Sequence, residues 1–87
     1  MTLPRCALVI GFQRTGQAVA RMLHGRGTAV RVLDARSAMA LGVVAEDWAH
    51  VELHLGTASG PSLLDGVELV VPSPGVPRAH PVLRAAG

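Results

Sequence analysis

The chain of 87 residues is 49% hydrophobic with a mean hydropathy of +0.39, which is typical of one small globular domain and excludes an intrinsically disordered chain. Its net charge is +2, but the eight basic residues are all arginines scattered along the sequence, and there is one Phe and one Trp, so the composition argues against a nucleic-acid-binding surface. Its apolar runs are far shorter than the ~20 residues of a membrane span and a lone cysteine allows no internal disulfide, so we expect a cytoplasmic protein without membrane contact.

The first part of the chain predicts a strand, a glycine-containing turn and a helix. The apolar run Cys6–Ile10 has the length of a parallel strand that is covered on both faces, and Cys6 is expected to be a small buried residue within it. A helix is predicted from Thr15 to His24, with Thr15 able to cap it and two glycines, Gly25 and Gly27, ending it. Its apolar stripe comprises Ala18, Val19, Met22 and Leu23, and its polar side comprises Gln17, Arg21 and His24.

Alternating strands and helices are predicted for the rest of the chain. The predicted elements are a strand over Ala29–Asp34, a loose helix over residues 37–49 that Gly42 weakens, a strand over Val51–Leu55, a helical turn over Pro61–Asp65, a strand over Val67–Val71 and a final helix over Val82–Ala86. The proline-rich segment PSPGVPRAHP separates the last two. This alternation predicts an α/β fold, a Rossmann-like doubly wound parallel sheet of about four strands, in one domain over residues 1–87.

Three short segments follow strands of this sheet, where open parallel sheets bind their ligands. They are GFQRTG (Gly11–Gly16), DAR (Asp34–Arg36) and SPG (Ser73–Gly75). If the strand order is 3-2-1-4, all three segments border one crevice. The sequence therefore predicts a ligand site at this edge of the sheet.

The segment Gly11–Gly16 has two of the glycines of a dinucleotide-binding turn. Gly11 permits a tight turn, Gly16 permits close packing of helix on strand, and Thr15 can offer its hydroxyl and N–H to a phosphate. Gln13 stands where that fingerprint has its second glycine. The alternative is a turn that only joins a strand to a helix.

The other two segments also allow two interpretations. Asp34 follows Gly16 by 18 residues, near the spacing at which an acid binds the ribose hydroxyls of NAD, and Arg36 could meet a phosphate or lie on a base. Pro74 fixes the backbone and Gly75 frees it, so that N–H groups near Gly75 could form an anion-binding nest. The alternatives are an exposed acid–base pair and a simple strand terminator.

Two other features, a possible metal-binding trio and the absence of a P-loop, give no further site. The trio His50, Glu52 and His54 would share one face of the third strand, but alternation with apolar residues explains it as the solvent side, and no metal site is predicted. The chain has no GxxxxGK[ST] sequence and no lysine, so it cannot hold ATP in a P-loop.

The segments VIGFQRTG, VLDAR and ELVVPSPGVPRAHPVLRAA, in this order, resemble the N-terminal domain of the UDP-N-acetylmuramoylalanine–D-glutamate ligases, Mur ligases of peptidoglycan synthesis. The resemblance covers nearly the whole chain and is most specific in Ser73–Pro81. It implies that this domain binds the UDP part of UDP-N-acetylmuramoyl-L-alanine. By motif position it assigns Arg14, Thr15 and Gly16 to the diphosphate, Asp34, Ala35 and Arg36 to the uracil, and Ser73, Pro74 and Gly75 to the closing of the site.

The resemblance also has departures. Gln13, Ala35 and Pro72 stand where the family usually has a small residue, a more polar residue and a small residue. ATP, magnesium and D-glutamate belong to the family's central and C-terminal domains, so the chain is expected to be cut from a cytoplasmic ligase of cell-wall synthesis and to bind without catalysing. Two alternatives are an NAD(P)-binding domain of an oxidoreductase, favoured by Asp34 and opposed by Gln13, and a nucleotide-sensing regulatory domain.

Overall fold

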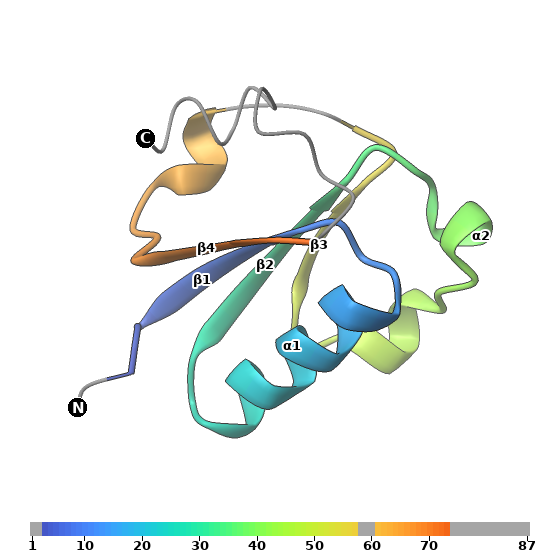
Figure 1. The fold of residues 1–87 in the computed structure, drawn as a ribbon. Helices are drawn as coiled ribbons and strands as arrows, with labels where there is room; N and C mark the ends of the chain where they lie inside the picture. The colour runs from blue at the N-terminus through green and yellow to red at the C-terminus, as the bar shows by residue number, and fades with distance from the viewer. Residues whose placement is uncertain (1–2, 58–60, 74–87) are drawn as a thin grey trace.

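A computed structural model of the chain describes residues 3–57 and 61–73, in which four parallel strands form one sheet in the order β3-β2-β1-β4 (Figure 1). This order and the parallel pairing confirm the predicted Rossmann-like sheet. The elements in chain order are β1 (Cys6–Ile10), α1 (Arg14–Gly25), β2 (Ala29–Asp34), α2 (Ala38–Leu41), η1 (Ala45–Trp48), β3 (Glu52–Leu55), η2 (Pro61–Leu64) and β4 (Leu69–Pro72), where η marks a 3-10 helix.

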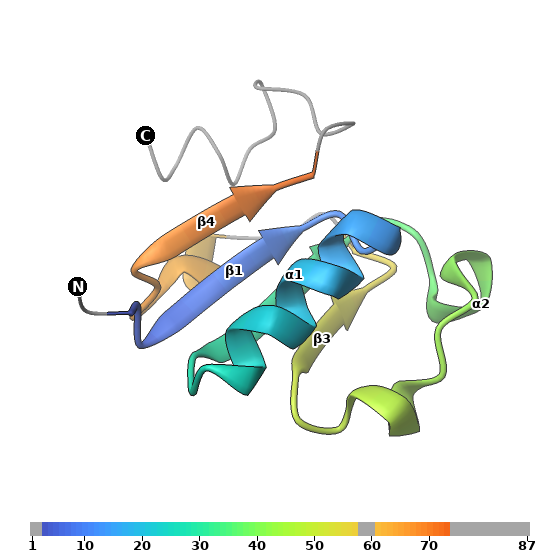
Figure 2. The same cartoon turned by 60° about the horizontal axis from the view of Figure 1, so that its bottom comes forward.

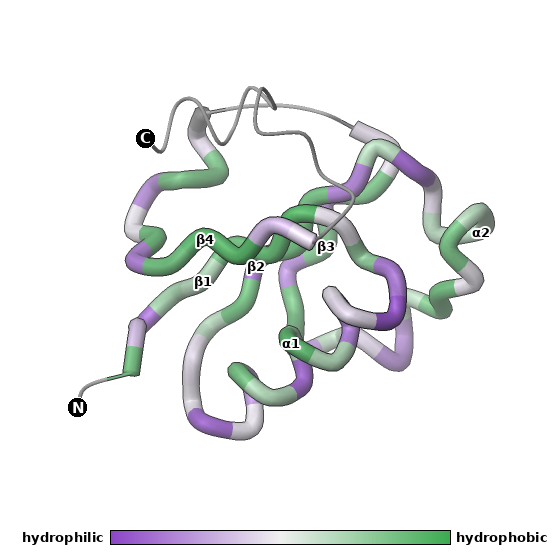
Figure 3. Tube along the Cα trace, viewed as in Figure 1, coloured by the Kyte–Doolittle hydropathy of each residue, from purple (hydrophilic) through white to green (hydrophobic). Residues whose placement is uncertain are grey.

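Helical segments cover both faces of the sheet. Figure 2 shows α1 lying along one face, and α1 and η1 supply Ala20, Leu23 and Trp48 to the larger apolar cluster on this face. The opposite face is covered by η2, whose Leu63 packs on alternate residues of the central strands. Because both of its faces are covered, β1 is buried from Ala7 to Ile10. Figure 3 shows hydrophobic colour along much of β1 and β4.

An arginine fixes η2 to the sheet. Arg31 lies on β2, and its Nη1 donates to the carbonyl oxygens of Leu63 at 2.9 Å and Asp65 at 2.6 Å. Its Nε also lies 3.3 Å from the Glu52 carboxylate on β3. The η2 segment before β4 is therefore held over the sheet by hydrogen bonds to a strand residue as well as by apolar contacts.

Helix α1 differs from its prediction at its start and in its buried face. It begins at Arg14, because the Gln17 N–H bonds the Gln13 carbonyl at 2.8 Å, so Gln13 is the N-cap and the prediction of Thr15 as the cap is wrong. The buried residues are Gly16, Ala20 and Leu23, which are spaced by four and three residues. Of the predicted stripe, Ala18 and Met22 are exposed, Val19 is half-buried and Leu23 is buried.

The segment 37–49 forms two short helices instead of one. Ser37 caps α2 by accepting the Ala40 N–H at 3.2 Å, and Gly42 ends α2 at a φ of +68°, a conformation that glycine adopts without strain. After η1, the third strand starts at Glu52, one residue later than predicted.

The remaining predicted elements have mixed outcomes. The fourth strand spans Leu69–Pro72 instead of Val67–Val71, and Pro72 is accepted because β4 is the edge strand of the described sheet. The helical turn at Pro61 is confirmed as η2, and Cys6 is half-buried where burial was expected. The helix predicted over Val82–Ala86 lies outside the described residues. In the described ranges, every helix is too short or too polar to cross a bilayer.

Candidate functional site

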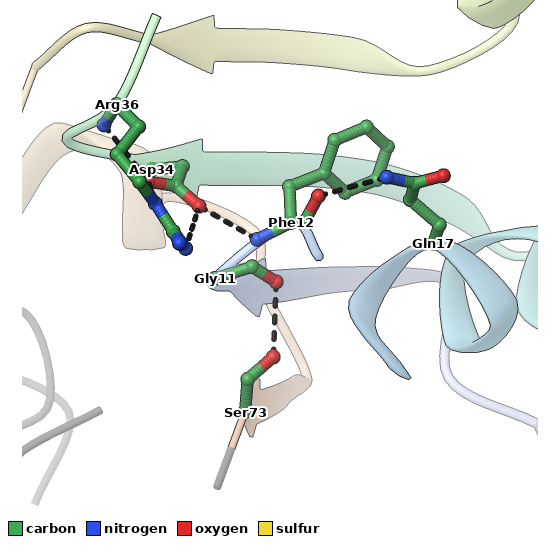
Figure 4. Close-up of polar contacts among 6 residues, drawn as sticks. All are labelled: Gly11, Phe12, Gln17, Asp34, Arg36 and Ser73. Atoms are coloured by element: carbon green, nitrogen blue, oxygen red, sulfur yellow. Dashed lines mark hydrogen bonds and ion pairs between the residues drawn. The ribbon is translucent and has the colours of Figure 1, made fainter. Parts of the chain in front are cut away.

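The carboxyl ends of three strands bring together the predicted segments Gly11–Gly16 and Asp34–Arg36 and the first residue of the third, Ser73 (Figure 4). The Gly11 N–H donates to the Leu33 carbonyl at 2.8 Å, which holds the turn after β1 against the end of β2. From the other side, Ser73 donates its N–H to the Ile10 carbonyl at 2.8 Å and its hydroxyl to the Gly11 carbonyl at 3.0 Å. The turn is thus fixed from both neighbouring strands. The predicted site residues Pro74 and Gly75 lie outside the described residues.

Both predicted glycine roles in the turn are confirmed. Gly11 has a φ of +91°, in the region that favours glycine, so the chain can turn sharply from β1 toward α1. At Gly16, a Cβ would lie 2.0 Å from the Gly11 carbonyl oxygen and 3.4 Å from the Ser73 hydroxyl oxygen. The absence of a side chain at Gly16 therefore allows helix α1 to approach the loop and the end of β4.

The amino end of α1 lies at this edge of the sheet, directly after the turn at Gly11. In the first turn of a helix the N–H groups have no acceptor within the helix, and their partial positive charge attracts anions. The three residues at this position are Arg14, Thr15 and Gly16, and there is no acidic residue in the first turn to neutralise the charge. The side chains of Gln13, Arg14 and Thr15 are exposed, so a ligand can reach them. This geometry suits a phosphate group.

Asp34, the last residue of β2, is bonded through both carboxylate oxygens. Oδ2 accepts the Phe12 N–H at 2.8 Å and Nη2 of Arg36 at 2.8 Å. Oδ1 accepts the Arg36 N–H at 2.8 Å and Nε of Arg36 at 3.0 Å. The Asp34 side chain is only 4% exposed, whereas that of Arg36 is 44% exposed. Asp34 therefore links the loop after β1 to the arginine that faces solvent.

These contacts determine the charge of the site. Burial by itself raises the pKa of Asp34, but the hydrogen bonds from the Arg36 side chain and from the N–H groups of Arg36 and Phe12 outweigh it and hold the pKa below its ordinary value of 3.8. Hydrogen bonding to the Asp34 carboxylate in turn raises the pKa of Arg36. Both groups are therefore ionised at neutral pH.

Phe12 and Gln17 belong to this site and were not among the predicted site residues. The Phe12 N–H donates a hydrogen bond to Asp34. The Phe12 carbonyl oxygen accepts one from Nε2 of Gln17 at 3.0 Å. Its ring is fully buried and contacts Trp48 edge to face, with ring centroids 4.7 Å apart. The sequence offered one signal, a large apolar residue directly after the turn glycine Gly11. Burial of the Phe12 ring in the core explains why an apolar residue stands at this position.

The trio His50, Glu52 and His54 does not form one group. Nε2 of His54 lies 2.7 Å from the Glu52 carboxylate, which also contacts Arg31. His50 lies elsewhere, with its ring centroid 4.1 Å from that of His24 on α1. Within residues 3–57 and 61–73, no three His, Cys, Asp or Glu side chains are placed to bind one metal ion.

Comparison with known proteins identifies the family. Residues 5–87 match the family described as the Mur ligase MurD-like, N-terminal domain. The chain belongs to this family. The chain is 45% identical over 84 residues to the UDP-N-acetylmuramoylalanine–D-glutamate ligase of Myxococcus xanthus, covering 91% of the chain and 18% of that ligase. The ligase of the same name from Nitratidesulfovibrio vulgaris is 42% identical over 86 residues, covering 93% of the chain and 19% of the relative.

Family membership confirms the resemblance that the three segments indicated. The UDP-N-acetylmuramoylalanine–D-glutamate ligase of Syntrophus aciditrophicus is likewise 45% identical over 84 residues, covering 91% of the chain and 18% of that ligase. The MurD-like domain described here thus spans about a fifth of the length of these relatives. Of the segments that carry the resemblance, Gly11–Gly16, Asp34–Arg36 and Ser73 lie at the carboxyl edge of the parallel sheet.

Proposed function

We propose that this domain binds the uridine diphosphate part of UDP-N-acetylmuramoyl-L-alanine, as the N-terminal domain of a cytoplasmic ligase that adds D-glutamate in peptidoglycan synthesis. The observation that carries the proposal is the convergence, around the turn at Gly11, of the uncompensated amino end of α1 and the half-exposed Arg36. One is suited to a diphosphate and the other to a planar base. Membership in the MurD-like family supports the same ligand.

The diphosphate is assigned to the start of α1. N–H groups of Arg14, Thr15 and Gly16 would donate to its oxygens, and the Arg14 guanidinium and the Thr15 hydroxyl are exposed beside them. Gly16 has a second role, because its missing side chain lets the helix start lie close to Gly11. The helix dipole and the arginine charge both favour a dianion there.

The uracil is assigned to the segment Asp34–Arg36, in which Arg36 would contact the base and Asp34 would hold Arg36 in place. The Arg36 guanidinium is held in place by two hydrogen bonds to Asp34, and its side chain is 44% exposed. Its planar group can therefore stack on the base or donate to the base's carbonyl oxygens. Ala35 is exposed between these two residues. Ser73, Pro74 and Gly75 are proposed to close the site, and of these Ser73 already bonds the turn.

The chemistry of the whole ligase is proposed to lie in other domains. The chain contains no lysine and no P-loop sequence, so its own residues do not provide a known cradle for ATP and magnesium. ATP would activate the substrate carboxylate and the amine of D-glutamate would displace phosphate in those domains. In this scheme, the present domain orients the substrate by holding its nucleotide end.

The bonds of Asp34 favour this proposal over an NAD-binding domain. In a dinucleotide site, the acid at the end of the second strand accepts hydrogen bonds from ribose hydroxyls. Here the Asp34 carboxylate is buried and accepts from Phe12 and Arg36. The exposed Gln13 side chain also stands where a pyrophosphate would approach bare backbone.

Calorimetric titration of the chain with UDP-N-acetylmuramoyl-L-alanine, UDP, NADH and ATP tests the proposal. We expect the two uridine ligands to bind and Arg36→Ala to weaken them by about tenfold, as the loss of a charged hydrogen bond does. Arg26→Ala is the matched control, because Arg26 is an exposed arginine at the opposite end of α1. NADH binding tenfold tighter than UDP, or equal effects of the two substitutions, would contradict the proposal.

A further inference from the structure

Asp34 makes a set of contacts that leaves its carboxylate no capacity for a ligand. A carboxylate has about four acceptor sites on its two oxygens. In this structure each oxygen accepts two hydrogen bonds, from Phe12 and Arg36 to Oδ2 and from two groups of Arg36 to Oδ1. The side chain is also nearly inaccessible, at 4% exposure. A ribose hydroxyl or a base could bond this group only by displacing a protein donor.

The donors to Asp34 come from the two halves of the candidate site. Phe12 lies between Gly11 and the start of α1, where the diphosphate is proposed to bind. Arg36 is the side chain proposed to bind the base. Figure 4 shows the carboxylate lying between these two residues. Within the described part of the chain, Arg36 is the charged side chain that contacts Asp34.

We infer that Asp34 is a positioning residue that couples the two halves of the nucleotide site, fixing the Gly11–Gly16 loop through Phe12 and the base-binding plane through Arg36, without contacting the nucleotide itself. The inference rests on the proposed function and deepens it. Phe12 N–H and the Arg36 guanidinium share one oxygen, Oδ2, so a change at either donor alters the acceptor of the other. Loss of the carboxylate is then expected to weaken the binding of both the base and the diphosphate.

The substitution Asp34→Asn separates this role from that of a direct ligand. An amide has one acceptor oxygen and places an NH₂ group where the carboxylate accepted hydrogen bonds, so it cannot satisfy both Phe12 and Arg36. The matched control is Asp47→Asn, which removes the same charge from an exposed residue of η1. The affinities of the unchanged chain and both variants are measured by NMR titration with uridine, inorganic pyrophosphate and UDP.

A positioning role predicts losses at both ends of the nucleotide. We expect Asp34→Asn to weaken uridine and pyrophosphate by about threefold each and UDP by about tenfold, with Asp47→Asn unchanged. Loss of uridine affinity alone would make Asp34 a ligand of the nucleoside and overturn the inference, as would unchanged UDP affinity. Absence of UDP binding by the unchanged chain would contradict the proposed function and, with it, the inference.

A second measurement keeps the inference testable if Asp34→Asn does not fold. In the unchanged chain, the Phe12 amide proton and the Arg36 Nε–H both donate to the carboxylate, so their NMR resonances should move with one shared midpoint as Asp34 titrates. UDP affinity should fall over the same pH range. Separate midpoints, or a Phe12 resonance that does not move, would overturn the coupling.

Discussion

At Gly16 the helix start and the turn after β1 come into contact with no space for a side chain. The nearest atom to a Cβ would be the Gly11 carbonyl oxygen, which is itself held by the Ser73 hydroxyl. A neighbour that is backbone and hydrogen-bonded cannot move aside as a flexible side chain can. Any substitution there must therefore displace α1 from the turn.

Gly16→Ala should destabilise the domain by about 1–3 kcal/mol, the range for forcing an extra carbon into a packed site, and should weaken UDP binding. Gly25→Ala is the matched control in the same helix, because no atom lies within 4 Å of the added Cβ. Alanine there should raise the free energy of unfolding by about 0.5–1 kcal/mol. Urea unfolding measures the free energy of unfolding of both variants. A Gly16→Ala variant as stable as Gly25→Ala would contradict the packing argument.

Asp34 should make the stability of the domain fall in acid. Its pKa in the folded state lies below the ordinary value of 3.8 that it takes when unfolded, so the unfolded state binds a proton more readily. Its stabilising contribution is complete above that ordinary value and is lost as the pH falls through the lowered folded pKa. Urea unfolding as a function of pH measures this loss.

Two variants separate Asp34 from the other acidic residues in that measurement. Asp34→Asn should be less stable at neutral pH and should lose stability less steeply in acid than the unchanged chain. Asp47→Asn should keep the slope of the unchanged chain, since Asp47 is exposed. Equal slopes for the two variants would show that the bonds of Asp34 do not stabilise the fold.

The sequence predicted the structural roles of the two site glycines better than it predicted the contacts of Asp34. Gly11 and Gly16 act through local geometry, a positive φ and a missing side chain, which a glycine at a strand–helix junction reveals directly. The partners of Asp34 depend instead on the register between β1 and β2, which places Phe12 beside a residue 22 positions later. No local pattern contains that information, so Phe12 was missed.

Among the elements, α1 shows that an amphipathic pattern can be right about the polar side of a helix and only partly right about its apolar side. The polar residue Arg21 lies with its guanidinium 4.5 Å from the centre of the Trp48 ring in η1, and the His24 ring contacts that of His50 after η1. Met22, by contrast, is 50% exposed. The predicted polar side was right for Arg21 and His24, which are both exposed, but hydropathy could not anticipate that they also contact residues of a segment that forms later in the chain.

Trp48 should be the main anchor of η1 on the rest of the domain. It is 3% exposed and packs between the Phe12 ring and the Arg21 guanidinium. Trp48→Leu should lower the free energy of unfolding by about 2–4 kcal/mol, as large-to-small core substitutions do. Met39→Leu is the control, because Met39 on α2 is 91% exposed and should change stability by less than about 0.5 kcal/mol. Similar losses for the two variants would contradict an anchoring role.

At the scale of the whole molecule, the sheet order was predictable because few topologies satisfy the connection rules. Right-handed crossovers between parallel strands, with β1 central and most apolar, leave the order β3-β2-β1-β4 as the natural arrangement. Strand bounds were less predictable, since β4 starts only where it can pair with β1, at Leu69 opposite Ala7. Partner strands set such limits, and they are far away in the sequence.

The purified chain should release no phosphate from ATP in the presence of magnesium, D-glutamate and UDP-N-acetylmuramoyl-L-alanine. The reason is that phosphoryl transfer needs a phosphate cradle and a bound metal, and the sequence has neither a lysine nor a P-loop. The UDP-N-acetylmuramoylalanine–D-glutamate ligase of Myxococcus xanthus serves as the positive control. Phosphate release from the chain that depends on D-glutamate would contradict the assignment of the chemistry to other domains.

Phe12 belongs at once to the interior and to the candidate site, and this limits how the domain can diverge. Its ring is fully buried against Trp48, while its N–H bonds Asp34. A replacement in the apolar interior that shifts the Phe12 backbone also shifts its N–H relative to the carboxylate. Interior and ligand specificity therefore cannot be optimised one at a time, and an engineer who redesigns the interior for heat resistance should hold Phe12 and Trp48 fixed.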